Sequence, residues 1–381
     1  MTHFRQFTTC LFTLGFAIGF ATSARADVVA KSRFYTLLAP DKKTAADRMR
    51  ELEWSARVFE TLLGVAPAPG RVVLSERPPG SVLLPGGRGA VLANTYQITG
   101  NTVAPDGSRW SLAWYAKENF GNTHGSRQYS ALTHEAAHLQ LVHAVNATAS
   151  EALKAQFNGY GAFLPDWIDE AVAVYHEPGR LKLLRRSQFR PDARIPLRTF
   201  FTMSHPASAK PRQVFIEART LEEAKKKFAA MQAQRGDQLE QSAAELSRNA
   251  AEVNRFYTQA LAVVEYMTAR GGRPFFRYVV AEQNQARTMD EILKAWPAKL
   301  IEITRLRPQI EGAAASQKQS PEAPPAPVNN IAGVLVRPGE IINPMPPTLD
   351  LFEADFVRWI KEHYPRYRPE LPSFPKKWFG E

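Results

Sequence analysis

Cysteine is almost absent from this chain. Cys10 is the only one among 381 residues, and it precedes the apolar run of an N-terminal leader, so it does not lie where a lipoprotein acceptor would. A mature chain that begins after the leader has no cysteine, which excludes disulfide bonds and thiolate ligands for zinc. A secreted protein of this size without disulfides fits a bacterial envelope better than an animal extracellular fluid.

The leader itself lacks an apolar run of membrane-spanning length. Leu11 to Ala21 is mostly apolar but falls well short of the roughly 20 residues that cross a bilayer as a helix. Arg5 precedes this run, and Ala24-Arg25-Ala26 follows it as a cleavage site of the A-x-A type. We therefore expect residues 1–26 to be a secretory signal peptide, with a periplasmic or secreted location in a bacterium and no transmembrane span after its removal.

Acidic residues are fewer than basic ones. The chain has 48 Lys and Arg against 37 Asp and Glu, a net charge of +11, which becomes +9 when Arg5 and Arg25 leave with the leader. A basic surface suits anionic partners such as envelope polymers or lipid headgroups, although solvated surface explains most such charge. No nucleic-acid recognition motif accompanies it, so we expect no nucleic-acid partner.

Internal repeats are also missing, and the pattern predicts a mixed α and β chain. Residues 27–311 are expected to form the main domain, 312–330 a Pro-rich linker, and 331–381 a tail with one amphipathic helix. A capping box at Asp350 to Glu353 is expected to open that helix, whose apolar side should dock on the main body. Trp110 and Trp114 are interpreted as core residues. The remaining predicted elements are strands at 33–38, 71–74, 90–93 and 110–115, and helices at 43–63, 254–267, 275–282 and 289–296.

One uninterrupted helical stretch carries an HExxH motif. His134 and His138 lie four residues apart, and neither Gly nor Pro interrupts the run from Ser130 to His143. Residues at this spacing share one face of a helix at about 5–6 Å between Cβ atoms, so both imidazoles can reach one metal ion. Glu135 is offset around the helix, and its carboxylate can take a proton from a water molecule that the metal activates.

A second motif begins at Pro165 and runs to Tyr175. It predicts a short, mostly apolar helix that carries Asp169 and Glu170. Acids in a buried helix need compensation for their charge, which a metal ion supplies, while the simpler alternative is the solvent-facing edge of an amphipathic helix. Glu170 is the best third ligand, and His124 and His176 remain open as others.

The two motifs together resemble those of the gluzincin metallopeptidases, and most closely the bacterial peptidase MA-like domains. The resemblance rests on the HExxH helix followed by Pro-Asp-Trp-Ile-Asp-Glu-Ala-Val-Ala-Val-Tyr, and covers roughly residues 32–300. It implies an α+β, zincin-like metallopeptidase fold, with an N-terminal mixed α/β lobe that holds the HExxH helix and a mostly helical C-terminal lobe. It also implies Zn²⁺ bound by His134, His138 and Glu170, Glu135 as general base, and Tyr257 as the residue that stabilises the transition state.

Departures from the family pattern narrow the expected function. A Gly-x-Met-x-Asn motif is missing, which favours an endopeptidase acting on peptides or proteins over an aminopeptidase. Position 174 is Val where thermolysin-like enzymes place an acid, so Asp169 or Asp166 is expected to orient a ligand histidine instead. Ser111 to Tyr115 is the candidate edge strand for holding substrate. The alternative is a catalytically inactive envelope protein that uses the zincin fold for binding or as a scaffold.

Overall fold

The computed structural model of the chain describes residues 28–75, 95–98, 109–115, 125–156, 162–206, 236–317, 329–331, 334–337 and 339–364. The expected signal peptide at 1–26 and the expected strand at 90–93 lie outside these residues. Most of the Pro-rich segment lies outside them too, while the helix that precedes it continues to Gln317, past position 312 where the composition predicts a linker.

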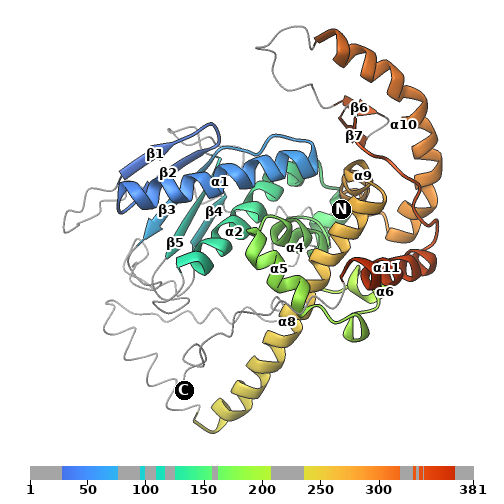
Figure 1. Cartoon of the computed structure of the whole chain (residues 1–381). Helices are drawn as coiled ribbons and strands as arrows, with labels where there is room; N and C mark the ends of the chain where they lie inside the picture. The colour runs from blue at the N-terminus through green and yellow to red at the C-terminus, as the bar shows by residue number, and fades with distance from the viewer. Residues whose placement is uncertain are drawn as a thin grey trace, which may run out of the picture.

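A mixed five-stranded sheet forms the N-terminal part of the molecule (Figure 1). Its strands stand in the order β1-β2-β3-β5-β4, with the inner three parallel and the two edge strands antiparallel to their neighbours. The expected strands at 33–38, 71–74 and 110–115 correspond to the parallel three. The strands are β1 (Val28–Lys31), β2 (Tyr35–Ala39), β3 (Gly70–Ser75), β4 (Thr95–Ile98) and β5 (Trp110–Tyr115).

Two helices cover one face of this sheet. Helix α1 (Lys42–Leu63) joins β2 to β3, as a parallel pair requires, and α2 (Gly125–Val145) follows β5. Small and aliphatic side chains of both helices share one buried cluster with the sheet, among them Leu52 of α1 and Leu132 of α2. This packing fixes α2, the helix with the HExxH motif, against the sheet.

Trp110 shows how closely the sheet is packed. Its side chain is fully buried, as expected, and its indole N–H donates to the carbonyl of Ala68 at 3.1 Å. Gly70 lies directly beneath the ring, and a Cβ added there would come within 2.1 Å of it. The strand pair β3–β5 therefore needs glycine at this position. The side chain of Trp114 is not among the side chains that the structure describes.

The rest of the described chain is helical and packs around a second, larger core. Two long helices, α8 and α10, run through this part, and α4 lies between α2 and α8 (Figure 1). The expected helices at 254–267, 275–282 and 289–296 fall within α8, α9 and α10. The helices are α3 (Glu151–Gln156), α4 (Asp166–Tyr175), α5 (Gly179–Gln188), α6 (Leu197–Phe200), α8 (Gly236–Arg270), α9 (Arg273–Gln283), α10 (Met289–Gln317) and α11 (Leu349–His363), with short 3-10 turns at Asn146–Thr148 and Pro191–Ala193 and a hairpin of β6 (Asn329–Ile331) and β7 (Val334–Val336).

Helix α11 docks on this helical part, as its apolar pattern predicts. Phe352 and Phe356 are fully buried, and their rings lie 5.0 and 5.4 Å from the ring of Tyr266 in α8. The expected cap was wrong by two residues. Thr348 caps the helix through the N–H of Leu351, while Glu353 instead pairs with Arg194 at 3.0 Å.

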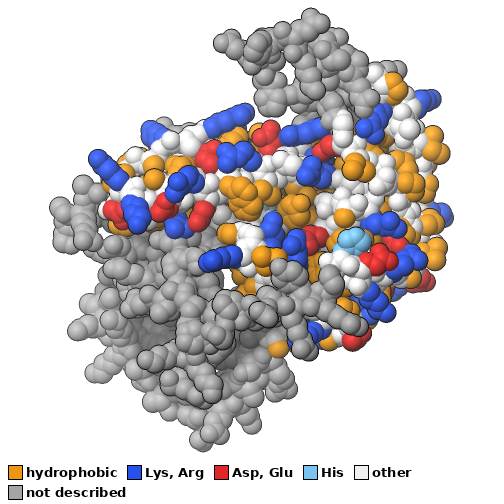
Figure 2. Space-filling model, viewed as in Figure 1, with side chains coloured by type: hydrophobic (Ala, Val, Ile, Leu, Met, Phe, Trp, Pro, Cys, Tyr) orange, Lys and Arg blue, Asp and Glu red, His pale blue; other side chains and the backbone are white. Residues whose placement is uncertain are grey.

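The described residues thus form an α+β fold with one sheet and a larger helical part. Within them, no helix combines the length and apolar character needed to cross a membrane. Figure 2 shows one face, where Lys and Arg side chains are scattered among acidic and hydrophobic ones. On that face, the basic charge of the described residues forms no single continuous patch.

Candidate metal centre

Helix α2 brings the two histidines of the HExxH motif together. Their Nε2 atoms lie 3.2 Å apart, and the ring centroids lie 4.8 Å apart. Apolar side chains close to them in sequence are buried in both cores of the molecule, Leu139 in the core at the sheet and Leu141 in the helical core. The helix is therefore anchored while both imidazoles point to one place, as the four-residue spacing predicts.

Helix α4 supplies the third group. Glu170 is fully buried, and its carboxylate oxygens lie 3.5 Å from Nε2 of His134 and 3.6 Å from Nε2 of His138. The helix begins after Pro165, whose fixed backbone angle suits a helix start, and its residues from Asp166 to Val174 are all buried. Glu170 therefore does not lie on a solvent-facing edge of an amphipathic helix, which was the simpler alternative. His134, His138 and Glu170 form a buried group that is compact enough to bind one metal ion.

The two Nε2 atoms are spaced for a tetrahedral ion. Two ligands with bonds of 2.0–2.1 Å in tetrahedral directions lie about 3.3–3.4 Å apart, and these atoms lie 3.2 Å apart. The distances of 3.5 and 3.6 Å from them to Glu170 end on its two different oxygens. With one oxygen of Glu170 as the third ligand, all three ligand atoms lie within 4.8 Å of one another, which is close enough for one metal ion.

The other ring nitrogens of both histidines face carboxylates. Oδ1 of Asp169 lies 3.0 Å from Nδ1 of His138, and Oε1 of Glu177 lies 3.0 Å from Nδ1 of His134. These contacts assign a proton to each Nδ1, so in the neutral rings both Nε2 atoms carry lone pairs directed at each other and at Glu170. Such an arrangement is favourable when a metal ion or a proton lies between these atoms.

Negative charge dominates this centre. Burial lowers the pKa of His138, but the charges of Asp169 and Glu170 outweigh that effect and raise the pKa to about 10. A buried cluster that attracts protons this strongly also attracts a divalent ion, which replaces the protons as it binds.

Glu177 was not foreseen from the sequence. It lies just past the end of α4, seven residues after Glu170, and is 1% exposed. Arg185 of α5 donates two hydrogen bonds to its carboxylate. Burial raises the pKa of Glu177, yet the hydrogen bonds from His134 and Arg185 hold this pKa below its ordinary value.

The two expected catalytic residues lie beside the ligands. The ring of Tyr257 lies 5.6 Å from that of His134 and beneath the guanidinium of Arg185, whose carbon is 4.8 Å from the ring centroid. Glu135 is half-buried. Burial first, and then the charges of Glu170 and Glu135, raise the pKa of Tyr257, so its hydroxyl stays protonated. Both side chains therefore face the space next to the metal group.

His205 is a second residue that sequence analysis missed. Its Nε2 lies 3.5 Å from Oε1 of Glu170, and its ring packs 5.4 Å from the ring of Tyr257. Burial is the main reason that the pKa of His205 falls to about 4. Of the two acids expected to orient a ligand histidine, Asp166 accepts the backbone N–H of His205 at 2.6 Å. The expectation for Asp169 is met by its contact with His138.

The other candidate histidines do not join the group. His176 is buried with its Nδ1 against the carbonyl of Val172 at 2.6 Å, and burial lowers its pKa to about 3. His143, five residues past His138, lies on a different face of α2 and is not part of the metal group. His124 lies outside the described residues.

The expected substrate edge was placed on the wrong strand. Ser111 to Tyr115 belongs to β5, which is paired on both sides, with β3 and with β4. The edge of the sheet next to it is formed by β4. Strand pairing joins segments far apart in the chain, so the local pattern could not distinguish an inner strand from an edge strand.

A comparison of the chain with protein-family models, with curated proteins and with solved structures finds no match. The likeness to gluzincins therefore rests on the two motifs and on the geometry of the residues they contribute.

Proposed function

We propose that the protein is a zinc-dependent peptidase of the bacterial envelope that cuts within peptide or protein chains. The observation that carries this proposal is the buried His134, His138 and Glu170 group with Glu135 beside it. A structural metal site needs only the ligands. A carboxylate placed next to the ligand histidines, without being one of the three ligands, is what hydrolysis requires. The leader-like residues 1–26 support the envelope location.

When bound, a divalent ion supplies a Lewis acid that polarises a substrate carbonyl and makes a neighbouring water molecule more acidic. Glu135 accepts the proton of that water as general base and passes it to the nitrogen of the leaving amine. The hydroxyl of Tyr257 stays protonated and donates a hydrogen bond to the negative charge that develops on the carbonyl oxygen. Asp169 and Glu177 hold the ligand histidines in the tautomer that exposes Nε2.

The donor set favours zinc among common ions. Two imidazoles and one carboxylate form a catalytic zinc site that leaves a fourth position open, although other divalent ions of the first transition series also bind such donors. The alternative of an inactive scaffold rests on the missing acid at position 174, on the basic surface and on the aromatic, Pro-rich tail. Asp169 and Glu177 give each ligand histidine a carboxylate partner, which answers the first of these three points.

The first experiment measures the metal in the purified chain from Asp27 onward by elemental mass spectrometry. We expect about one zinc ion per chain, and its loss in Glu170→Ala. Glu353→Ala serves as the matched control, because it removes a glutamate that pairs with Arg194 away from the metal group. Absence of metal in the wild-type protein, even after incubation with zinc, would contradict the proposal.

The second experiment separates binding from turnover. Glu135→Gln is expected to keep the metal and to lose hydrolysis of casein and of a quenched fluorescent peptide library. Zinc binding without any activity in the wild-type protein would favour the scaffold alternative. Equal activity in wild type and Glu135→Gln would show that another group is the base.

A further inference from the structure

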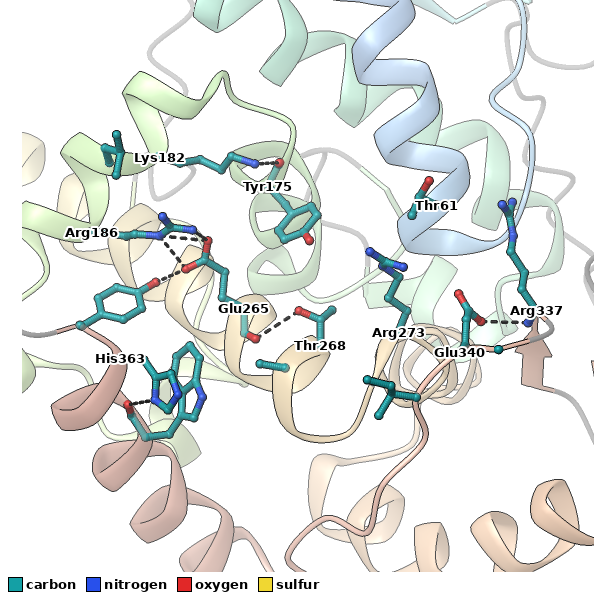
Figure 3. A pocket seen from close by; sticks show the side chains of 17 residues that line it. Thr61, Tyr175, Lys182, Arg186, Glu265, Thr268, Arg273, Arg337, Glu340 and His363 are labelled. Carbon is teal, nitrogen blue, oxygen red and sulfur yellow. Dashed lines mark hydrogen bonds and ion pairs between the residues drawn. The ribbon is translucent and has the colours of Figure 1, made fainter. Parts of the chain in front are cut away.

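A large cavity lies apart from the metal centre, among the ends of α1, α4, α5, α8 and α11 (Figure 3). Its volume is about 1010 Å³, and none of His134, His138 and Glu170 lines it. Four basic and two acidic side chains line the cavity. The basic ones are Lys182, Arg186, Arg273 and Arg337, and the acidic ones are Glu265 and Glu340.

Both carboxylates of the cavity are already fully engaged. Glu265 accepts hydrogen bonds from Arg186 on both oxygens and one from the hydroxyl of Tyr364 at 2.6 Å. Glu340 accepts two from Arg277, at 2.6 and 2.8 Å, and one from the backbone N–H of Arg337. Each oxygen of both carboxylates therefore already accepts a hydrogen bond from a neighbouring residue.

Among the residues that the structure describes, two cations of the cavity have no carboxylate within hydrogen-bonding distance, although Glu265 and Glu177 act on Lys182 at longer range. The ammonium of Lys182 donates to the carbonyl of Tyr175 at 3.1 Å and lies 4.9 Å from the centroid of that ring. It is also 5.5 Å from the ring of Trp54, and burial lowers its pKa. Arg273 is exposed at the start of α9 and forms no hydrogen bond or ion pair with any residue that the structure describes. Its guanidinium and the ring of Tyr175 both project into the cavity in Figure 3.

A partly desolvated ammonium without a carboxylate is costly unless a ligand provides the negative charge. We infer that this cavity binds an oxyanion, a phosphate or a carboxylate, between Lys182 and Arg273. The volume is in the range that encloses a drug-sized molecule, so the oxyanion is one end of a larger organic ligand. Tyr175, Trp359 and Tyr364 line the remaining wall and offer aromatic faces to its body.

The test is calorimetric titration of the purified protein with inorganic phosphate and with citrate at constant ionic strength. Arg273→Ala and Lys182→Met are each expected to weaken binding of the probe by about tenfold or more, the value of a charge-assisted hydrogen bond. Arg180→Ala is the matched control, because Arg180 is exposed on α5, carries the same charge and does not line the cavity. The control is expected to bind the probes as the wild type does.

The source of the oxyanion is tested in a second arm. Vesicles of phosphatidylglycerol and phosphatidylcholine are sedimented with each protein, and vesicles of phosphatidylcholine alone are the reference. Binding of soluble probes that depends on Arg273 and Lys182 supports a free small anion. Sedimentation with the anionic vesicles that depends on the same two residues supports a lipid headgroup as the source.

The inference is overturned if neither probe nor vesicle binds, or if Arg180→Ala weakens binding as much as Arg273→Ala. The latter result would mean that only the general basic charge attracts anions. Thermal midpoints of all three variants are measured in parallel, so that a misfolded variant is not mistaken for a binding defect. The outcome is independent of the peptidase proposal, because the metal ligands do not contribute to this cavity.

Discussion

Glu177 joins the metal centre to the helix behind it. Its Oε1 accepts the Nδ1 proton of His134 at 3.0 Å, and Arg185 of α5 holds the same carboxylate with two hydrogen bonds. The guanidinium of Arg185 also lies over the ring of Tyr257. One buried ion pair therefore positions a metal ligand and the side chain expected to stabilise the transition state.

Replacing Glu177 by Gln should weaken metal binding. The loss of charge behind His134 makes its Nε2 a poorer donor, and partners of this kind are typically worth about 10–100-fold in metal affinity. The measurement is zinc competition against a chromophoric chelator. Glu353→Gln, which alters a carboxylate paired with Arg194 instead, is the control and should keep the wild-type affinity. Equal affinity in Glu177→Gln and wild type would show that Arg185 and the helix alone hold His134.

Removing the metal should destabilise the folded protein. Without the metal, a proton on His138, whose pKa is raised to about 10, is what offsets the charge of the buried Glu170. A ligand present at 100 times its dissociation constant stabilises the folded state by about 2.7 kcal/mol. We expect a strong chelator to lower the thermal midpoint of the wild type and to leave that of Glu170→Ala unchanged. Differential scanning calorimetry with and without added zinc measures both. A midpoint that the chelator lowers equally in both proteins would place the relevant metal elsewhere.

Tyr257→Phe should slow the chemical step without releasing the metal. Removal of one hydrogen-bond donor to a developing oxyanion typically costs about 10²–10³ in kcat. The ring and its packing against Arg185 and His205 stay in place, so KM and the zinc content should change little. Steady-state kinetics on a peptide that the wild type cleaves gives the comparison. Tyr364→Phe, which loses a hydroxyl in the separate cavity, should keep the wild-type kcat.

The group that could hold a metal ion could be predicted from the sequence because the positions of its residues depend on local spacing. His134 and His138 share a helical face whatever the rest of the fold does, and the apolar run around Glu170 already indicated a buried acid. The strand at 110–115 and the helix at 43–63 were likewise visible as local patterns. Each of these features requires only a few consecutive residues.

Features that depend on contacts between distant segments could not be predicted in this way. Glu177 reaches His134 only because the chain turns after His176, and Arg185 arrives from the next helix. His205 belongs to a short segment without helical periodicity, so nothing in its neighbourhood marked it. The inner position of β5 is decided by its pairing with β3 and β4, which are separated from it in the chain by segments of irregular composition.

The last prediction concerns whether α11 is part of the main folding unit. Phe356 is fully buried against Tyr266 of α8, whose hydroxyl also donates to Asp355 at 2.8 Å, while Leu351 on the same helix is 56% exposed. Phe356→Ala should therefore lower the free energy of unfolding by about 3–5 kcal/mol. Leu351→Ala should change it by no more than about 0.5 kcal/mol.

The unfolding free energies of both variants are measured by urea denaturation followed through tryptophan fluorescence. Trp359 lies on α11 itself, so both variants are made in a Trp359→Phe background, in which Trp110 and Trp167 report on the sheet and on α4. A shift of the remaining transition in Phe356→Ala then means that the C-terminal helix and the rest of the fold unfold together. An unchanged transition would instead make α11 an appendage whose loss leaves the metal centre intact.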